Sequence, residues 1–239
     1  KNKHSIKVID NKYRLIEVFG KNYLNPIGLS VPGDPSSAAF FIALTLLNNN
    51  SYIKIRNVGV NSTRSGFYRL LKKHGAQIKF EKIKNKNSEP VGDIVARSCK
   101  LKPIKASKDY YVNSTDEYPI LFVIAALTKG VSVFKGIKEL ANKESNRIKE
   151  MQNVIKQIGI KSVFSKNELK IFGKGIIDAS NKRVIVRNLG DHRICMSSFV
   201  LAILTGAKTK IDNFETVNTS SPSFLKIMKS LGVKFEKKN

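Results

Sequence analysis

Charged residues interrupt the apolar pattern of this chain at three places, and each place is the predicted start of a helix. The residues concerned are Asp116, Lys143, Glu144, Arg147, Asp191, His192 and Arg193. The start of a helix presents unpaired backbone N–H groups and the positive end of a dipole, so it favours a bound anion. Because the three places occupy equivalent positions in a repeated pattern, we expect them to gather on one face of the domain.

Most of these groups also have a simpler interpretation. Asp116, in NSTDEYPILF, could cap the helix that follows it, and Asp191 could do the same in GDHRICM. Glu144 and Arg147 are three residues apart, so they could form an ordinary ion pair on the surface of a helix. Arg193 fits such an explanation less well, because it enters an apolar segment where an arginine without a partner is unstable. It suggests a bound anion.

The elements that carry these residues form a pattern that occurs three times, roughly every 75–85 residues. Each copy has an apolar helix, a short strand, a second helix that ends at a glycine, and another strand. The apolar helices are predicted within residues 36–47, 117–130 and 191–206, and the second helices within 62–75, 143–159 and 220–232. Since the first helices are hydrophobic on almost all sides, we expect them at the centre of a pseudo-threefold domain, packed on mixed sheets.

The segments between and after the copies predict further strands. Residues 85–98 contain Glu-Pro-Val-Gly, which favours a turn followed by a short strand, and residues 165–175 favour a hairpin. Residues 233–236, at the end of the third copy, predict a strand with no hairpin after it. The missing strands of this copy must therefore come from elsewhere or leave an open sheet edge.

The length and composition allow one large hydrophobic core or two modest ones, since the chain has 239 residues of which 41% are hydrophobic. The turn-forming Pro32-Gly33 predicts a domain boundary, with Asp34 or Ser36 as the cap of the first apolar helix. The longest apolar run, residues 120–127, is too short to span a bilayer, and the polar start of the chain does not read as a signal peptide. We therefore expect no membrane partner.

The net charge of +25 would ordinarily suggest nucleic acid as a partner. The excess, however, is mostly lysine scattered singly along the chain, which indicates compositional drift, and a cleft lined by these cations would also attract small phosphorylated anions. Cys99 and Cys195 lack metal-ligand spacing, so we expect packed thiols, a reduced cytoplasmic location, and no metal or organic cofactor.

Motifs along essentially the whole chain resemble those of 5-enolpyruvylshikimate-3-phosphate (EPSP) synthase. These motifs are VPGDPSSAAFF, NSTRSG, TDEYPILFVIAAL, GIKELANKESNRI, GDHRICM and NTSSPSF. The order and separation of DEYP, KES-R and DHR are most similar to the bacterial glyphosate-tolerant class, and the resemblance is to the C-terminal half of that enzyme. It implies a mixed α/β (α+β) fold of the enolpyruvyl transferase type, which is a pseudo-threefold inside-out barrel of sheet-and-helix units.

The resemblance also implies how the chain is divided. Residues 1–33 correspond to the tail of the N-terminal domain and the crossover, and residues 34–239 correspond to the C-terminal enolpyruvyl transferase domain. The missing strands of the third copy would come from the extreme N-terminus of the full-length enzyme. The Lys-Ser-x-x-x-Arg loop of the N-terminal domain has no counterpart here, because residues 33–37 resemble only its opening. The expected partner is thus the missing N-terminal domain of the same enzyme. Without that domain this chain supplies only one wall of the substrate cleft, and we expect it to be inactive.

The activity that the resemblance implies is transfer of the enolpyruvyl group from phosphoenolpyruvate to the 5-hydroxyl of shikimate 3-phosphate, with release of phosphate. This reaction belongs to the shikimate pathway, which leads to chorismate and the aromatic amino acids. The roles carried over by motif are a proton acceptor (Asp116), a group that handles the proton at C3 (Glu144), a contact to the shikimate substrate (Lys143), two arginines that grip phosphoenolpyruvate (Arg147 and Arg193), and two supporting residues (Asp191 and His192).

Two positions depart from the family's Arg-x-Lys-Glu-Ser/Thr-Asp-Arg pattern. Ala141 replaces the first Arg, and Asn146 replaces the Asp. Asn146 keeps a polar side chain but loses a charge that could steady Arg147, so we interpret both changes as local scaffolding.

Three alternatives remain at this point. The sister enzyme that transfers enolpyruvyl to UDP-N-acetylglucosamine has the same fold, but KES-R followed by GDHR fits it less well. A basic nucleic-acid-binding module could use the same repeat, although neither an RNP-type aromatic motif nor a DNA-reading basic helix is visible. A degenerate half kept as a scaffold or regulator would fold but bind neither anion.

Overall fold

The computed structural model describes residues 6–10, 15–18, 26–187 and 190–237, and it divides the chain into two units, residues 1–31 and 32–239. In the first unit, β1 (Ile6–Asp10) and β2 (Leu15–Val18) pair as an antiparallel hairpin. Other parts of the predicted 1–33 segment, residues 1–5, 11–14 and 19–25, lie outside the described residues.

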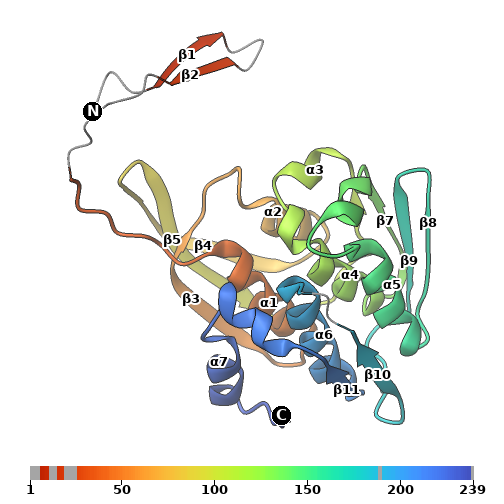
Figure 1. The fold of residues 1–239 in the computed structure, drawn as a ribbon. Coiled ribbons are helices and arrows are strands. Elements are labelled where there is room, and N and C mark those ends of the chain that lie inside the picture. Colours follow the sequence, from red (N-terminus) through yellow and green to blue (C-terminus); the bar gives the residue numbers. More distant parts are fainter. Residues whose placement is uncertain (1–5, 11–14, 19–25, 188–189, 238–239) are drawn as a thin grey trace. The chain divides into compact units, whose positions relative to one another are not determined.

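Three apolar helices form the centre of the second unit. They are α1 (Pro35–Leu47), α4 (Tyr118–Ala126) and α6 (His192–Thr205), which pack against one another side by side (Figure 1). Every residue of α4 is buried, as are ten of the thirteen residues of α1. The prediction that the first helices are interior is confirmed, because a helix that is apolar on all sides can satisfy its surface only by packing against neighbours all round.

The first sheet packs against α1 and has the order β3-β5-β4, with both pairs antiparallel. Its strands are β3 (Tyr52–Gly59), β4 (Gln77–Lys86) and β5 (Glu89–Arg97). The turn between β4 and β5 lies at Asn87-Ser88, which have φ values of 50° and 68°. The turn and following strand predicted within residues 85–98 are confirmed, but the turn comes just before Glu-Pro-Val-Gly, because Pro90 and Gly92 lie within β5. Gly92 is needed there because a Cβ would lie 2.9 Å from the carbonyl oxygen of Glu81.

The second sheet has the order β6-β7-β9-β8 and consists of parallel and antiparallel pairs. Its strands are β6 (Lys105–Ala106), β7 (Gly130–Lys135), β8 (Lys161–Ser165) and β9 (Glu168–Gly173). The hairpin predicted within residues 165–175 is confirmed in its turn, but its first strand lies earlier, as β8. Lys166 and Asn167 make the turn with φ values of 48° and 63°, which match the twist of a two-residue hairpin.

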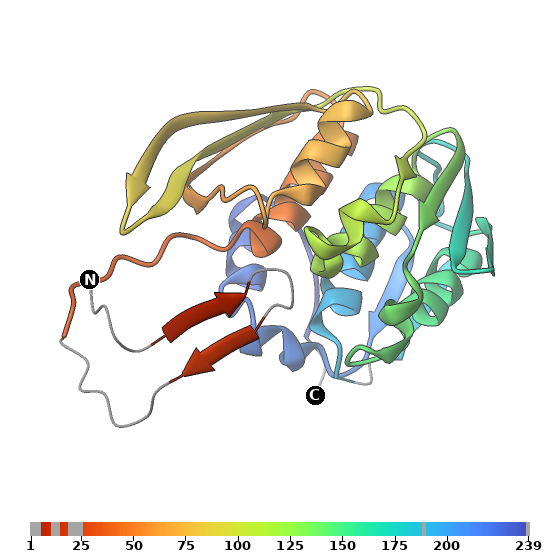
Figure 2. The same ribbon diagram turned by 90° about the horizontal axis from the view of Figure 1, so that it is seen from above.

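The second helices lie outside the central three, as Figure 2 shows from above for α2 and α5. They are α2 (Gly66–Lys73), α5 (Arg147–Gln157) and α7 (Phe224–Ser230). The apolar residues of α5 are buried while Lys149 and Lys156 are exposed, so the predicted amphipathic face is confirmed. Gly75, Gly159 and Gly232 follow these helices with φ values of 95°, 83° and 87°, the conformation that ends a helix at a glycine.

The third sheet is smaller, with only β10 (Arg183–Val186) and β11 (Lys208–Ile211) paired in parallel among the described residues. The side chain of Gln157 covers the outer edge of β10, since Nε2 donates to the carbonyl oxygen of Ile185 at 3.0 Å and Oε1 accepts from its N–H at 2.8 Å. The strand predicted at residues 233–236 is wrong. A strand needs a hydrogen-bonded neighbour, and the described part of the chain supplies none at this place.

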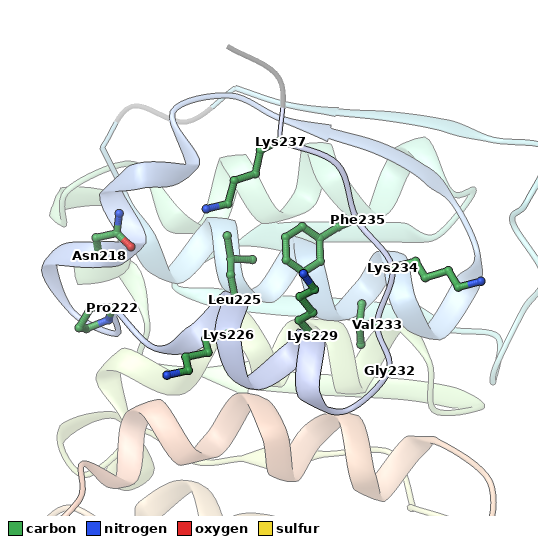
Figure 3. Close-up of a pocket in the computed structure, with 10 residues that line it drawn as sticks. All are labelled: Asn218, Pro222, Leu225, Lys226, Lys229, Gly232, Val233, Lys234, Phe235 and Lys237. Carbon is green, nitrogen blue, oxygen red and sulfur yellow. The ribbon is translucent and has the colours of Figure 1, made fainter.

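An open groove lies beside this C-terminal segment, with a volume of about 770 Å³ (Figure 3). Leu225, Val233 and Phe235 give it an apolar floor, and lysines of α7 and the following segment surround them. The sequence analysis left two possibilities for the third copy, strands supplied from elsewhere or an open sheet edge. The described residues match the open edge more closely.

Candidate functional site

Asp191 is the N-cap of α6 and the most buried carboxylate of the candidate site. Its Oδ1 accepts hydrogen bonds from the backbone N–H groups of Arg193 at 3.0 Å and Ile194 at 3.4 Å, which confirms the predicted cap. Its Oδ2 accepts from Ser145 Oγ and from Arg147 Nε, both at 2.9 Å. Asp191 therefore links the start of α6 to the start of α5. In its ion pair with Arg147, each of the two side chains is 1% exposed.

Arg147, the first residue of α5, is enclosed by carboxylates on three sides. Besides Asp191, its NH2 donates to Glu144 Oε2 at 2.7 Å and its NH1 to Asp116 Oδ1 at 3.4 Å. Burial alone would lower the pKa of Arg147, but the three carboxylates outweigh it and the pKa is raised. The interpretation of Glu144 and Arg147 as a surface ion pair is wrong, because only the glutamate is exposed.

Asp116 lies in a short 3-10 turn, η1 (Thr115–Glu117), just before α4. The prediction that it caps α4 is wrong: the turn moves the start of the helix, so that Glu117 occupies the cap position and makes no side-chain capping bond. Asp116 instead bridges two arginines, with 3.4 Å from Oδ1 to Arg147 NH1 and 3.6 Å from Oδ2 to Arg193 NH2. Its side chain is 40% exposed, so it stands between these cations and solvent.

Arg193 carries hydrogen-bond donors that the described residues do not satisfy. The residue is 6% exposed, and its Nε and NH1 have no partner among the described atoms. Leaving a buried charged donor without a partner is costly, by about 1–3 kcal/mol or more. A guanidinium held in this way is suited to bind an oxyanion through charge-assisted hydrogen bonds. This geometry supports the anion suggested by the sequence.

Lys143 and His192 flank these residues without entering the ion-pair network. Lys143 is exposed and forms no ion pair with any residue that the structure describes. His192 is half-buried, and burial, together with the charge of Arg193, lowers its pKa, so its imidazole is neutral at pH 7. The structure therefore joins Asp116, Glu144, Arg147, Asp191 and Arg193 directly, and places the other two predicted residues beside them.

Sequence reasoning missed two members of this site. Ser145 is buried and bonds Asp191, and Glu117 is a buried carboxyl directly after Asp116. Asn146, interpreted as scaffolding, is the N-cap of α5 and accepts from the N–H of Lys149 at 3.0 Å. This cap could have been predicted from the sequence, because asparagine is a common residue just before a helix. The burial of Glu117 could not have been predicted, because acidic residues at helix starts are usually solvated.

The rest of the described chain offers little competing chemistry. The described residues contain no cluster of His, Cys, Asp and Glu side chains arranged to hold a metal ion. Cys195 is buried, and burial raises the pKa of its thiol to about 12, so it packs as predicted. Among the described helices, none has the length and apolar content to cross a membrane.

Structural comparison defines the class of protein to which this fold and site belong. The enolpyruvyl transferase NikO from Streptomyces tendae superimposes with a TM-score of 0.63 at 14% identity, over 83% of this chain and 43% of that one, a likeness of fold alone. EPSP synthase from Acinetobacter baumannii superimposes with a TM-score of 0.84 at 31% identity, over 95% of this chain and 52% of that one. The fold is the inside-out, pseudo-threefold α/β barrel of the enolpyruvyl transferases.

Sequence comparison then identifies the family. The model of EPSP synthase (3-phosphoshikimate 1-carboxyvinyltransferase) matches residues 2–228, and the chain belongs to the EPSP synthase family. The 3-phosphoshikimate 1-carboxyvinyltransferase of Paramagnetospirillum magneticum is 36% identical, over 95% of this chain and 50% of its own length. That of Zymomonas mobilis is 36% identical over 93% and 50%. The chain thus spans about half the length of these curated relatives.

Proposed function

We propose that this chain supplies the C-terminal half of an active site that transfers the enolpyruvyl group of phosphoenolpyruvate to the 5-hydroxyl of shikimate 3-phosphate and releases phosphate. The family match favours this reaction over the UDP-N-acetylglucosamine transferase and the nucleic-acid-binding module. The observation that carries the proposal is the network around Arg147, beside which Arg193 keeps two buried donors open.

In this proposal Arg193 holds the carboxylate or phosphate of phosphoenolpyruvate. Its open Nε and NH1 are charged donors, and such an anion accepts hydrogen bonds from groups of this kind. Arg147 is already bonded by Asp191, Glu144 and Asp116, so it can grip the substrate only when one of the two exposed carboxylates turns away. Arg147 therefore contributes mainly fixed positive charge, held in place by Asp191.

The two exposed carboxylates take the proton-transfer roles. Asp116 accepts the proton of the attacking hydroxyl, and Glu144 handles the proton at C3 of phosphoenolpyruvate, because both reach solvent while their other contacts fix their direction. Lys143, exposed next to Glu144, contacts the shikimate substrate. His192, neutral at pH 7, supports the start of α6 without adding charge.

The other wall of the active site belongs to an N-terminal domain of the same enzyme, in keeping with coverage of about half of each relative. Bringing both substrates into line needs both walls. The pathway we propose is aromatic amino-acid biosynthesis by way of chorismate. Both cysteines are free, as suits a reducing compartment, and we include a cytoplasmic location in the proposal.

The test is phosphate release by the chain joined to its N-terminal half, with both substrates present. The variant Glu144→Gln should lower kcat by at least about 10²-fold, which is typical for loss of a general acid or base. Glu139→Gln is the matched control, since Glu139 is an exposed carboxylate of the adjacent 3-10 turn, η2 (Lys138–Asn142). Absence of turnover in the joined wild-type protein would favour the scaffold alternative, and normal turnover in Glu144→Gln would refute the assigned role.

A further inference from the structure

Four carboxylates lie around the open donors of Arg193. Asp116, Glu144 and Asp191 contact the two arginines directly, and Glu117 is a fourth acid at the same place. An anion that binds Arg193 must therefore come close to these four acids. Like charges at short range disfavour each other, so binding is easier if one acid becomes neutral.

Glu117 is the acid best placed to become neutral. It is 4% exposed, whereas the side chains of Asp116 and Glu144 are 40% and 48% exposed. Asp191 is buried as well, but its two oxygens already accept hydrogen bonds from Arg147, Ser145 and the start of α6. Glu117 forms no ion pair with any residue that the structure describes.

The groups that face Glu117 come from each element packed around it. The hydroxyl of Ser36 in α1 and the charges of Arg64 and Arg193 favour its ionised form, and Asp116 repels its charge. Asp34 at the start of α1 and the buried Tyr68 of α2 complete the surroundings. Burial is the largest influence and raises the pKa of Glu117 to about 7, despite Ser36 and the two arginines. Its proton is thus exchangeable near neutral pH.

We propose that Glu117 takes up a proton from solvent when an oxyanion binds Arg193, so that anion binding at this site is coupled to protonation of a residue that does not touch the anion. The incoming negative charge raises the proton affinity of Glu117, and by reciprocity a protonated Glu117 raises the affinity for the anion. Glu117 is a positioning residue in this scheme. The inference rests on the proposed function only in taking Arg193 as the anion-binding group.

The sign of the coupling follows from the protonation states. Well below pH 7, Glu117 is already neutral and no proton moves on binding. As pH rises through the neutral range, binding must draw a proton onto Glu117, so the affinity falls with pH. An uptake of about half a proton corresponds to an affinity loss of about threefold for each pH unit.

Isothermal titration calorimetry with inorganic sulfate tests the proposal on the 239-residue chain. Sulfate keeps its charge across the neutral range, so any proton taken up belongs to the protein. Titrations in buffers of different ionisation enthalpy give the number of protons bound per sulfate. We expect about half a proton near pH 7 for the wild type and for the control Glu139→Gln, and close to none for Glu117→Gln, which keeps the shape of the side chain.

Each outcome decides the matter. Loss of proton uptake in Glu117→Gln, with its return in Glu117→Asp and loss of saturable sulfate binding in Arg193→Gln, supports the proposal. Uptake that persists in Glu117→Gln, or a wild type that binds no sulfate saturably, overturns it. Circular dichroism of each variant checks that it is folded. Sulfate binding with the expected proton uptake, but no transferase turnover in the joined protein, would refute the proposed function and leave this coupling intact.

Discussion

Two Asp–Arg pairs at helix starts of this domain have the same chemistry and very different surroundings. Asp34 caps α1 through the N–H groups of Ser36 and Ser37 and lies 3.3 Å from Arg64, with side chains 41% and 54% exposed. Asp191 caps α6 and lies 2.9 Å from Arg147, with both side chains 1% exposed. The first pair is solvated, and the second is buried between the starts of α5 and α6.

The difference shows that burial, and not residue type, decides what such a pair does. An exposed pair is worth about 0–1 kcal/mol, because water solvates each partner nearly as well. A buried pair resists loss of either partner, since the remaining charge is stranded in a poorly solvated place. The buried pair thus provides a fixed scaffold beside the open donors of Arg193, which the solvated pair could not.

Removing the cation of the buried pair should have the largest effect. In Arg147→Ala, Asp191 loses its charged partner and a buried cavity is left, so the free energy of unfolding should fall by about 3–5 kcal/mol. Urea denaturation followed by circular dichroism measures it. A loss below about 1 kcal/mol would mean that the two pairs are equivalent and that the comparison fails.

Removing the charge but keeping the cap sharpens the comparison. Asn is as good an N-cap as Asp, so Asp191→Asn should retain the bonds to the start of α6 and lose mainly the charge that faces Arg147. We expect a loss of about 2–4 kcal/mol. The matched variant Asp34→Asn, at the solvated pair, should lose at most about 0.5 kcal/mol by the same denaturation assay. Equal losses at both positions would show that capping, and not burial of the pair, dominates.

The buried pair also marks the limit of what the sequence could predict. The apolar helices, their central position and the Asp191 cap followed from local pattern, because periodicity and capping residues are read within one turn. The burial of Arg147 did not, since its nearest partner in the sequence, Glu144, suggests a surface pair, while the partner that matters is 44 residues away. The strand expected at 233–236 failed for the same reason: strand formation depends on a neighbour that local sequence cannot show.

Glu117 connects the two regions, and its stability effect should depend on pH. The pKa of a carboxyl is about 4.5 in the unfolded chain and about 7 for Glu117 in the fold, so the folded state binds more protons between these values. Its contribution to stability is complete below about pH 4.5 and is lost as pH rises to about 7, by at most about 3 kcal/mol.

The variant Glu117→Gln removes that dependence. It should match the wild type near pH 5 and be more stable by about 1–3 kcal/mol near pH 8, where the wild type holds a buried charge. Thermal unfolding at the two pH values measures the difference. A variant that is equally destabilised at both values would show that Glu117 acts through its shape alone.

The smallest effect is expected at the solvated pair. Arg64→Ala removes the contact to Asp34 and a hydrogen bond of 3.1 Å to Ser36 Oγ, and should lower the free energy of unfolding by less than about 1 kcal/mol. Because the pair is exposed, this loss should shrink further in high salt, whereas the loss in Arg147→Ala should not. The salt dependence is the more informative measurement. A loss of more than about 2 kcal/mol in the free energy of unfolding of Arg64→Ala, unchanged by salt, would contradict this expectation. It would mean that the hydrogen bond to the buried Ser36 makes Arg64 part of the buried network. The boundary between the solvated and the buried region would then lie at Asp34.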